Sequence, residues 1–141
     1  MKPLTLAAAQ IVCQDGKVLE NLSRSSQMAE NAKNQGAQLV LFPEFLPQGY
    51  LLTSALWDSA EPFDGPTVQW LRETSHRLGI YIGTSFLEAR NGHFYNTFAL
   101  AEPGGKIAGV VQKQGIKSSL WPGGAGNCQG LSASMPIAAT S

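Results

Sequence analysis

The chain has 141 residues, of which 43% are hydrophobic and 14% charged, with ten basic and ten acidic side chains. This length and composition are typical of one globular domain and exclude a wholly disordered chain. The zero net charge provides none of the basic surface that nucleic-acid binding usually needs, so we expect a small molecule or another protein as the partner.

The number and spacing of the cysteines and histidines argue against a disulfide framework and against a zinc site. Cys13 and Cys128 are too few for a disulfide framework. Like His76 and His93, they show none of the spacings of zinc ligands. We interpret Cys13 as a small buried apolar residue, and we expect neither a metal nor an organic cofactor.

No apolar run approaches the length of a membrane span, and the N-terminus lacks the basic start and cleavage site of a signal peptide. We therefore expect a cytoplasmic protein without a membrane partner.

The first third of the chain predicts a parallel crossover unit. Residues 4–12 are apolar and predict a buried strand, and the spacing of small apolar residues predicts a helix over residues 20–35 that ends at Gly36. Residues 38–42 form a continuous apolar run, which predicts a strand buried on both faces. Strand, helix and strand in this order indicate two parallel strands joined by a crossover.

A long loop is predicted over residues 45–66, which contain several prolines and glycines. Loops of this length are often functional. Tyr50 and Trp57 in this loop could contact a substrate, although packing is the commoner role of an aromatic side chain. A helix over residues 67–78 follows, with Gly79 as its stop.

The next segment predicts three strands, over residues 80–88, 93–101 and 106–113. Asn91-Gly92 between two apolar runs is a strong hairpin signal, and residues 103–105 predict a second turn.

Alternation along the last predicted strand places four residues on one face: Ile107, Gly109, Val111 and Lys113.

The order of the predicted strands and helices leads us to expect an α/β domain over residues 1–117. An irregular tail rich in Gly, Ala and Ser follows over residues 118–141.

Glu44 is the first candidate for chemistry. It stands just past the carboxyl end of a predicted strand, where ligand sites of α/β sheets gather, and its carboxylate could act as a general base. Its position fits a helix-capping or surface-paired glutamate equally well.

Lys113 is the second candidate, because it ends an otherwise apolar strand face. A lysine in that position is more often a surface side chain whose stem covers apolar neighbours. Lys117 is the weaker candidate, since it lies beyond the strand.

Other catalytic motifs are absent or incomplete. Residues 83–87 begin like a nucleophile elbow but lack its second glycine, and no phosphate-binding loop occurs. The glycines of residues 124–126 do not lie between a predicted strand and a helix, so they are weak evidence for a dinucleotide site.

Taken together, several segments resemble the nitrilase, or carbon–nitrogen hydrolase, superfamily. The resemblance runs from residue 8 to residue 113 and is strongest at residues 36–44, which end in Phe42-Pro43-Glu44. The other segments that carry it are Ala8-Ala9-Gln10, Gly49-Tyr50, Asp64-Gly65-Pro66, Gly79-Ile80-Tyr81-Ile82-Gly83, Tyr95-Asn96-Thr97 and Pro103-Gly104-Gly105-Lys106.

The resemblance implies a partial αββα sandwich, with a mixed β-sheet and flanking helices. It implies hydrolysis of an amide or nitrile through a Glu, Lys and Cys set. Glu44 matches the general base of that set, and Lys113 matches the lysine that stabilises the oxyanion. It also implies a small-molecule amide or nitrile as the partner, and homo-oligomeric assembly, which is frequent in the family.

The chain departs from the family pattern after Lys113. The family's cysteine lies a few tens of residues after the lysine and precedes an aromatic and an acidic residue, whereas Cys128 is close to Lys113 and precedes Gln129 and Gly130. No acidic residue follows Lys113, although many members have a second glutamate there.

We therefore expect that the chain stops before its nucleophile, that Cys128 is a poor substitute, and that the chain alone is inactive. The alternative is a non-catalytic interaction or regulatory protein that uses the half-fold.

Overall fold

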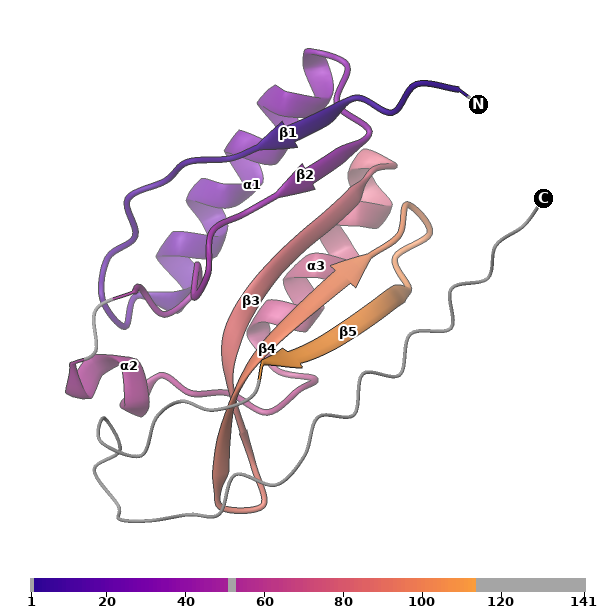
Figure 1. The fold of residues 1–141 in the computed structure, drawn as a ribbon. Coiled ribbons are helices and arrows are strands. Elements are labelled where there is room, and N and C mark those ends of the chain that lie inside the picture. Colours follow the sequence, from indigo (N-terminus) through magenta and orange to yellow (C-terminus); the bar gives the residue numbers. More distant parts are fainter. Residues whose placement is uncertain (1, 51–52, 114–141) are drawn as a thin grey trace.

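The computed structural model describes residues 2–50 and 53–113, and in this part five strands form one mixed sheet with the order β1-β2-β3-β4-β5 (Figure 1). The strands are β1 (Leu6–Ala8), β2 (Leu39–Leu41), β3 (Tyr81–Arg90), β4 (His93–Ala101) and β5 (Ile107–Lys113). The helices are α1 (Val18–Asn34), α2 (Ser54–Asp58) and α3 (Pro66–Leu78). Figure 1 shows α1 and α3 together on one side of the sheet.

The predicted crossover unit is confirmed. β1 pairs with β2 and β2 pairs with β3 in parallel, while β3, β4 and β5 pair antiparallel. The first two strands are three residues long, so the apolar runs 4–12 and 38–42 overestimated them. The prediction of a buried strand over residues 4–12 is wrong for the described part of the chain, since Leu4, Leu6 and Val12 are 59%, 54% and 83% exposed. An apolar run does not record which neighbours cover it.

Local turn chemistry places the later elements where the sequence predicted them. Asn91 and Gly92 have φ angles of 52° and 75°, as expected for a two-residue hairpin turn between β3 and β4. Pro66 opens α3, and Gly79, with a φ angle of 66°, ends it in the left-handed conformation.

The prediction that residues 38–42 are buried on both faces is wrong for the described part of the chain. Val40 is fully buried against the helices, whereas Leu39 and Leu41 are half-buried on the opposite face. Among the described residues, α1 and α3 cover one face of the sheet, and Leu6 (54% exposed) and Tyr81 (38% exposed) lie on the other. We call these the covered face and the open face.

The prediction that Ile107 shares a face with Lys113 is also wrong. The β4–β5 register shifts between Leu100 and Ala101, so that Ile107 pairs with Ala101 and Gly109 with Leu100. Such a bulge reverses the alternation at one point of the strand. Ile107 packs against the covered-face core as a result, while Val111 and Lys113 stay on the open face.

The predicted loop 45–66 is more ordered than expected, because it contains α2 and an additional bridge to the sheet. The backbone N–H of Glu61 donates to Leu87 O (3.0 Å), and Ala89 N–H donates to Glu61 O (2.8 Å). Leu56 of α2 packs with Phe45 in a small second core.

The main core lies between the sheet and the two long helices. Its fully buried side chains come from α1, α3 and the covered face, and they include Ala29, Val40, Leu71, Ile82 and Phe86. No helix of the described part is long and apolar enough to cross a bilayer. The predicted tail, with Lys117 and Cys128, lies outside the described residues.

Candidate active site

Glu44 lies on a short turn after β2 that hydrogen bonds hold to β3 on both sides. The Thr84 hydroxyl donates to Pro43 O (3.1 Å), and the backbone N–H of Phe45 donates to Ser85 Oγ (3.0 Å). Phe45 has a φ angle of 52°, which is uncommon for a residue other than glycine. The neighbouring strand therefore fixes the direction in which the Glu44 carboxylate points.

A second set of hydrogen bonds connects the segment after Glu44 to the segment before α1 and to β3. The buried Asn21 side chain donates to Gln14 O (2.7 Å) and Pro47 O (2.9 Å), which joins the segments before α1 and after Glu44. The buried Gln48 side chain accepts a bond from Leu87 N–H (3.1 Å). These bonds satisfy loop groups that would otherwise be buried without partners.

Lys113 and Asn96 converge on one oxygen of Glu44. Lys113 Nζ lies 3.1 Å from Glu44 Oε1, and Asn96 Nδ2 donates to the same oxygen at 2.5 Å. Asn96 and Lys113 are register partners in β4 and β5, so both side chains project from the same place on the open face. The structure thus brings together the two residues that the sequence singled out.

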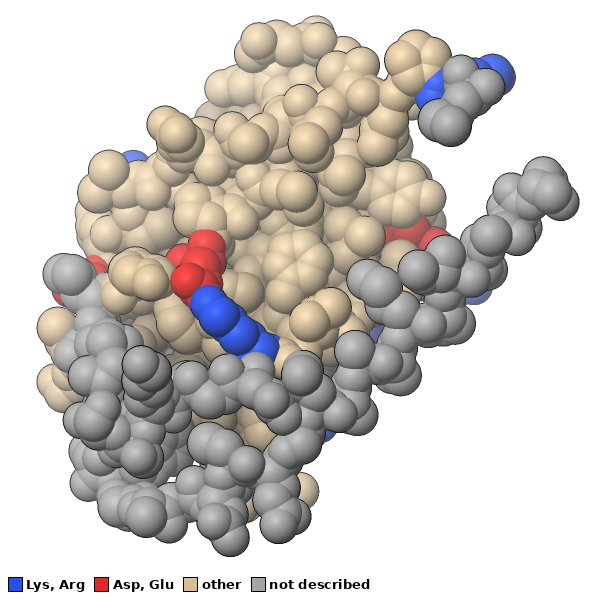
Figure 2. Space-filling view, in the orientation of Figure 1, with Lys and Arg blue, Asp and Glu red and all other residues tan. Residues whose placement is uncertain are grey.

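These groups line a cavity of about 370 Å³ on the open face. Its remaining walls are mostly apolar, from Phe42, Phe98 and Val111, with Ser85 as a further polar group. Figure 2 shows that the middle of the face turned toward the reader is largely tan, and that an acidic and a basic group touch each other there. An apolar cavity with a few convergent polar groups is the usual form of a small-molecule site.

The ion pair is open to solvent on its lysine side. The Lys113 side chain is 71% exposed and that of Glu44 is 33% exposed. Water screens such a pair, so it adds little to stability. Both groups are instead accessible to a ligand: the carboxylate can accept a proton, and the ammonium can lie against a developing negative charge.

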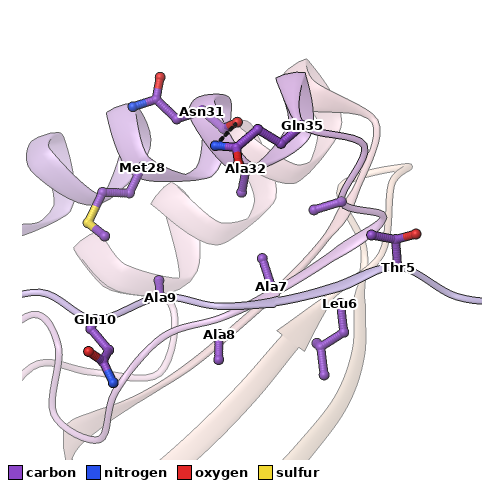
Figure 3. A pocket seen from close by; sticks show the side chains of 11 residues that line it. Thr5, Leu6, Ala7, Ala8, Ala9, Gln10, Met28, Asn31, Ala32 and Gln35 are labelled. Carbon is purple, nitrogen blue, oxygen red and sulfur yellow. Dashed lines mark hydrogen bonds between the residues drawn. The ribbon is translucent and has the colours of Figure 1, made fainter.

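A second hollow, of about 400 Å³, lies between β1 and α1 (Figure 3). Ala7 and Ala9 point toward α1, and Gln35 donates to Asn31 O within the helix (3.3 Å). Its lining contains no ionisable side chain. It therefore lacks the acid, base or nucleophile that hydrolysis needs, and the cavity beside Glu44 is the better candidate.

The two aromatic residues that the sequence offered as substrate contacts do not line the cavity. Trp57 packs edge-on against Phe94, with ring centroids 5.3 Å apart, as part of the second core. Tyr50 is 66% exposed. The packing interpretation is confirmed for Trp57.

Asn96 is the site residue that sequence reasoning did not assign a role. Alternation along β4 contained the signal, because Asn96 and Phe98 occupy one face and Asn96 is the polar member nearest the hairpin. Which residue of β5 faces Asn96 depends on the bulge, which the sequence did not reveal.

Cys13 lies outside this cavity. Its thiol packs against the main core, and burial raises the pKa of Cys13 above its usual value, an effect that the nearby Arg24 charge opposes. A raised pKa leaves little thiolate at neutral pH, the opposite of what a nucleophilic cysteine needs. Among the described residues, no three His, Cys, Asp or Glu side chains are grouped as metal ligands.

Comparison with known proteins identifies the family of the chain. The family model described as carbon–nitrogen hydrolase matches residues 5–127. The chain belongs to the carbon–nitrogen hydrolase family. Its mixed sheet with flanking helices is the α/β fold of that family's solved structures.

The relatives of this chain include proteins named as amidases. The chain is 30% identical over 118 residues to the N-carbamoylputrescine amidase of Solanum lycopersicum, which covers 80% of this chain and 39% of that protein. It is 33% identical over 108 residues to the omega-amidase NIT2 of Danio rerio, covering 76% and 38%. The chain thus spans about two fifths of the length of these curated relatives.

Solved structures show the same relation. A CN-hydrolase superfamily protein from Xanthomonas campestris superposes with a TM-score of 0.73 at 26% identity, covering 83% of this chain and 43% of that one. An amidase from Nesterenkonia sp. gives a TM-score of 0.64 at 21% identity, over 81% and 44% of the two chains, and shows the shared fold.

Proposed function

We propose that this chain supplies the general base and the oxyanion-binding cation of an enzyme that hydrolyses an amide or nitrile. The convergence of Lys113 and Asn96 on one oxygen of Glu44, inside a cavity of about 370 Å³, carries the proposal. Family membership supports it, since the curated relatives are named as amidases.

The chemistry of an amide substrate assigns a role to each group. The Glu44 carboxylate takes the proton of a cysteine thiol, and the sulfur attacks the amide carbon to form a tetrahedral intermediate. The Lys113 ammonium stabilises the negative charge on the former carbonyl oxygen. The C–N bond breaks as Glu44 returns the proton to the nitrogen, and ammonia leaves a thioester behind.

Water completes the cycle. Glu44 takes a proton from a water molecule, whose oxygen attacks the thioester carbon, and the proton passes to the departing sulfur. The sum is one amide and one water converted to one carboxylic acid and one ammonia. Asn96 holds the Glu44 oxygen in place during both proton transfers.

The thiol comes from a residue outside the described lining of the cavity. Cys13 does not line it, and burial raises the pKa of that thiol. Cys128 lies outside the described residues, and Gln129 and Gly130 follow it in place of the aromatic and acidic residues that the family resemblance implies after the nucleophile. This part of the proposal predicts that the chain alone has no turnover.

The names of the relatives favour an amide over a nitrile as the substrate. The apolar walls formed by Phe42, Phe98 and Val111 suit an uncharged substituent next to the reacting carbon. Homo-oligomeric assembly and a cytoplasmic location stay predictions.

The first experiment measures ammonia released by the purified 141-residue chain from simple amides and nitriles. We expect none above background. Turnover that disappears in Cys128→Ala would show that this residue is the nucleophile, and turnover that persists would require another one.

The second experiment places the described part of this chain in a longer relative. In a chimera, residues 5–113 replace the matching segment of the Danio rerio omega-amidase, and ammonia release from an ω-amide is followed. We expect turnover that Glu44→Gln and Lys113→Met each lower by about 100-fold or more. The exposed residues Glu73 and Lys106 provide matched controls, because Glu73→Gln and Lys106→Met lie outside the cavity lining.

Full activity in the Glu44→Gln chimera would contradict the proposal. A folded chimera that binds the ω-amide but releases no ammonia would instead favour the non-catalytic alternative.

A further inference from the structure

A buried carboxylate lies on the covered face, behind the candidate active site. Glu88 of β3 is 0% exposed. Its Oε2 atom accepts a hydrogen bond of 2.6 Å from the Thr97 hydroxyl of β4 and another of 3.1 Å from the Gln112 side-chain amide of β5. One carboxylate oxygen therefore joins three neighbouring strands.

The two residues bonded to Glu88 are sequence neighbours of the two that bond Glu44. Thr97 follows Asn96 in β4, and Gln112 precedes Lys113 in β5. Because side chains alternate along a strand, each pair of neighbours points to opposite faces. The register pairs Asn96 with Lys113 and Thr97 with Gln112, so the two sets of bonds involve adjacent residue pairs of the β4–β5 ladder.

The carboxylate is costly to place there. A buried charge needs hydrogen-bond or charge partners. Its Oε1 atom accepts no hydrogen bond from the described residues and lies 3.7 Å from Arg90 Nε. The Arg90 guanidinium also donates to Gln112 Oε1 (3.2 Å) and lies over the Tyr95 ring. An apolar side chain would fill the same space without that cost, but it could accept neither hydrogen bond.

We infer that Glu88 is a positioning residue, which fixes β4 and β5 relative to β3 so that Asn96 and Lys113 meet at one oxygen of Glu44. The role rests on the proposed function, since the arrangement matters to a reaction only if those groups act on substrate. Glu88 does not line the cavity and touches no substrate itself.

The chain offers a matched control in Glu61. It is also buried (4% exposed), and it is the bridge partner of Glu88 on the same side of the sheet. Its Oε1 atom accepts a bond from Thr67 N–H in the first turn of α3 (2.9 Å), not from β4 or β5. Substitutions at Glu61 and Glu88 each remove a buried carboxylate, but only the Glu88 carboxylate is hydrogen-bonded to β4 and β5.

The test uses the full ¹⁵N-labelled chain and the side-chain amide signal of Asn96, whose protons report the bond to Glu44. We expect Glu88→Met to shift this signal and to accelerate exchange of its protons with water several-fold. Glu88→Gln keeps an acceptor oxygen, so this variant should retain the native Asn96 signal. Glu61→Met should also leave the signal unchanged. Thr97→Val removes the donor hydroxyl and should shift the signal in the same direction as Glu88→Met.

An unchanged Asn96 signal in both Glu88→Met and Thr97→Val would overturn the inference. Equal shifts in Glu88→Met and Glu61→Met would also overturn it, because they would indicate general loosening. If Glu88→Met does not fold, Thr97→Val and Glu88→Gln still decide the matter. None of these signals depends on turnover, so an inactive omega-amidase chimera would contradict the proposed function without affecting this result.

Discussion

The covered face and the open face of the sheet differ in packing and in chemistry. On the covered face, Val40, Ile82 and Phe86 are fully buried against α1 and α3. On the open face, Leu6 and Tyr81 are partly exposed, and Glu44 meets Lys113 in a cavity. In this chain the groups that hold the fold together and the groups suited to catalysis are therefore separated by the thickness of one sheet.

The largest expected effect is a difference in the free energy of unfolding between two Leu→Ala variants, one on the covered face and one on the open face. Leu71 of α3 is 0% exposed, and Leu6 of β1 is 54% exposed. We expect Leu71→Ala to lower the free energy of unfolding by about 2–5 kcal/mol through lost burial and a cavity. Leu6→Ala should lower it by less than about 1 kcal/mol. Urea titration of both variants measures the difference, and equal losses would contradict the assignment of the two faces.

A smaller effect is expected from pH, at Glu61 on the covered face. Burial raises the pKa of Glu61 above 4.5, an effect that hydrogen bonds from Thr67 oppose. The folded chain therefore binds this proton more tightly than the unfolded chain, so ionisation of Glu61 lowers stability as pH rises from about 4.5 through the raised pKa.

Glu61→Gln removes this titration. The variant should gain stability relative to the native chain as pH rises from 4 to 8, by about 1.4 kcal/mol for each pH unit by which the pKa is raised. Unfolding titrations of both proteins at several pH values measure this. A Glu61→Gln variant that loses stability relative to the native chain as pH rises would contradict a raised pKa at Glu61.

The smallest effect is expected at Lys113, on the open face. Its ion pair with Glu44 is largely exposed, so Lys113→Met should change the free energy of unfolding by about 0–1 kcal/mol. Thermal unfolding should hardly distinguish it from Lys106→Met, although the two variants should differ widely in the chimera assay. A loss of several kcal/mol in Lys113→Met would mean that the pair is structural.

The sequence predicted the parts of the fold that local chemistry determines. Hydrophobic spacing with Gly36 and Gly79 located the two long helices, and Asn91-Gly92 located the hairpin. The burial of residues 38–42 on one face could not be read in this way, since an apolar run does not record which neighbours cover it. The side of Ile107 depended on a bulge, for which the sequence carries no distinct signal.

The candidate site was predictable for two residues and obscure for the others. Glu44 and Lys113 stand at strand ends, and the family resemblance selected them. Alternation along β4 indicated that Asn96 shares a face with Phe98, but its position opposite Lys113 required the register of β4 against β5. Glu88 looked like an ordinary strand residue, because its role comes from contacts with Thr97 and Gln112 on two other strands.

A crystal structure of the full chain tests most directly whether one glutamate oxygen is shared by a lysine and an asparagine on the open face. It should show Lys113 Nζ near 3.1 Å from Glu44 Oε1, with Asn96 Nδ2 donating to the same atom. Glu44 and Lys113 more than about 4 Å apart, with their side chains in separate environments, would contradict the account.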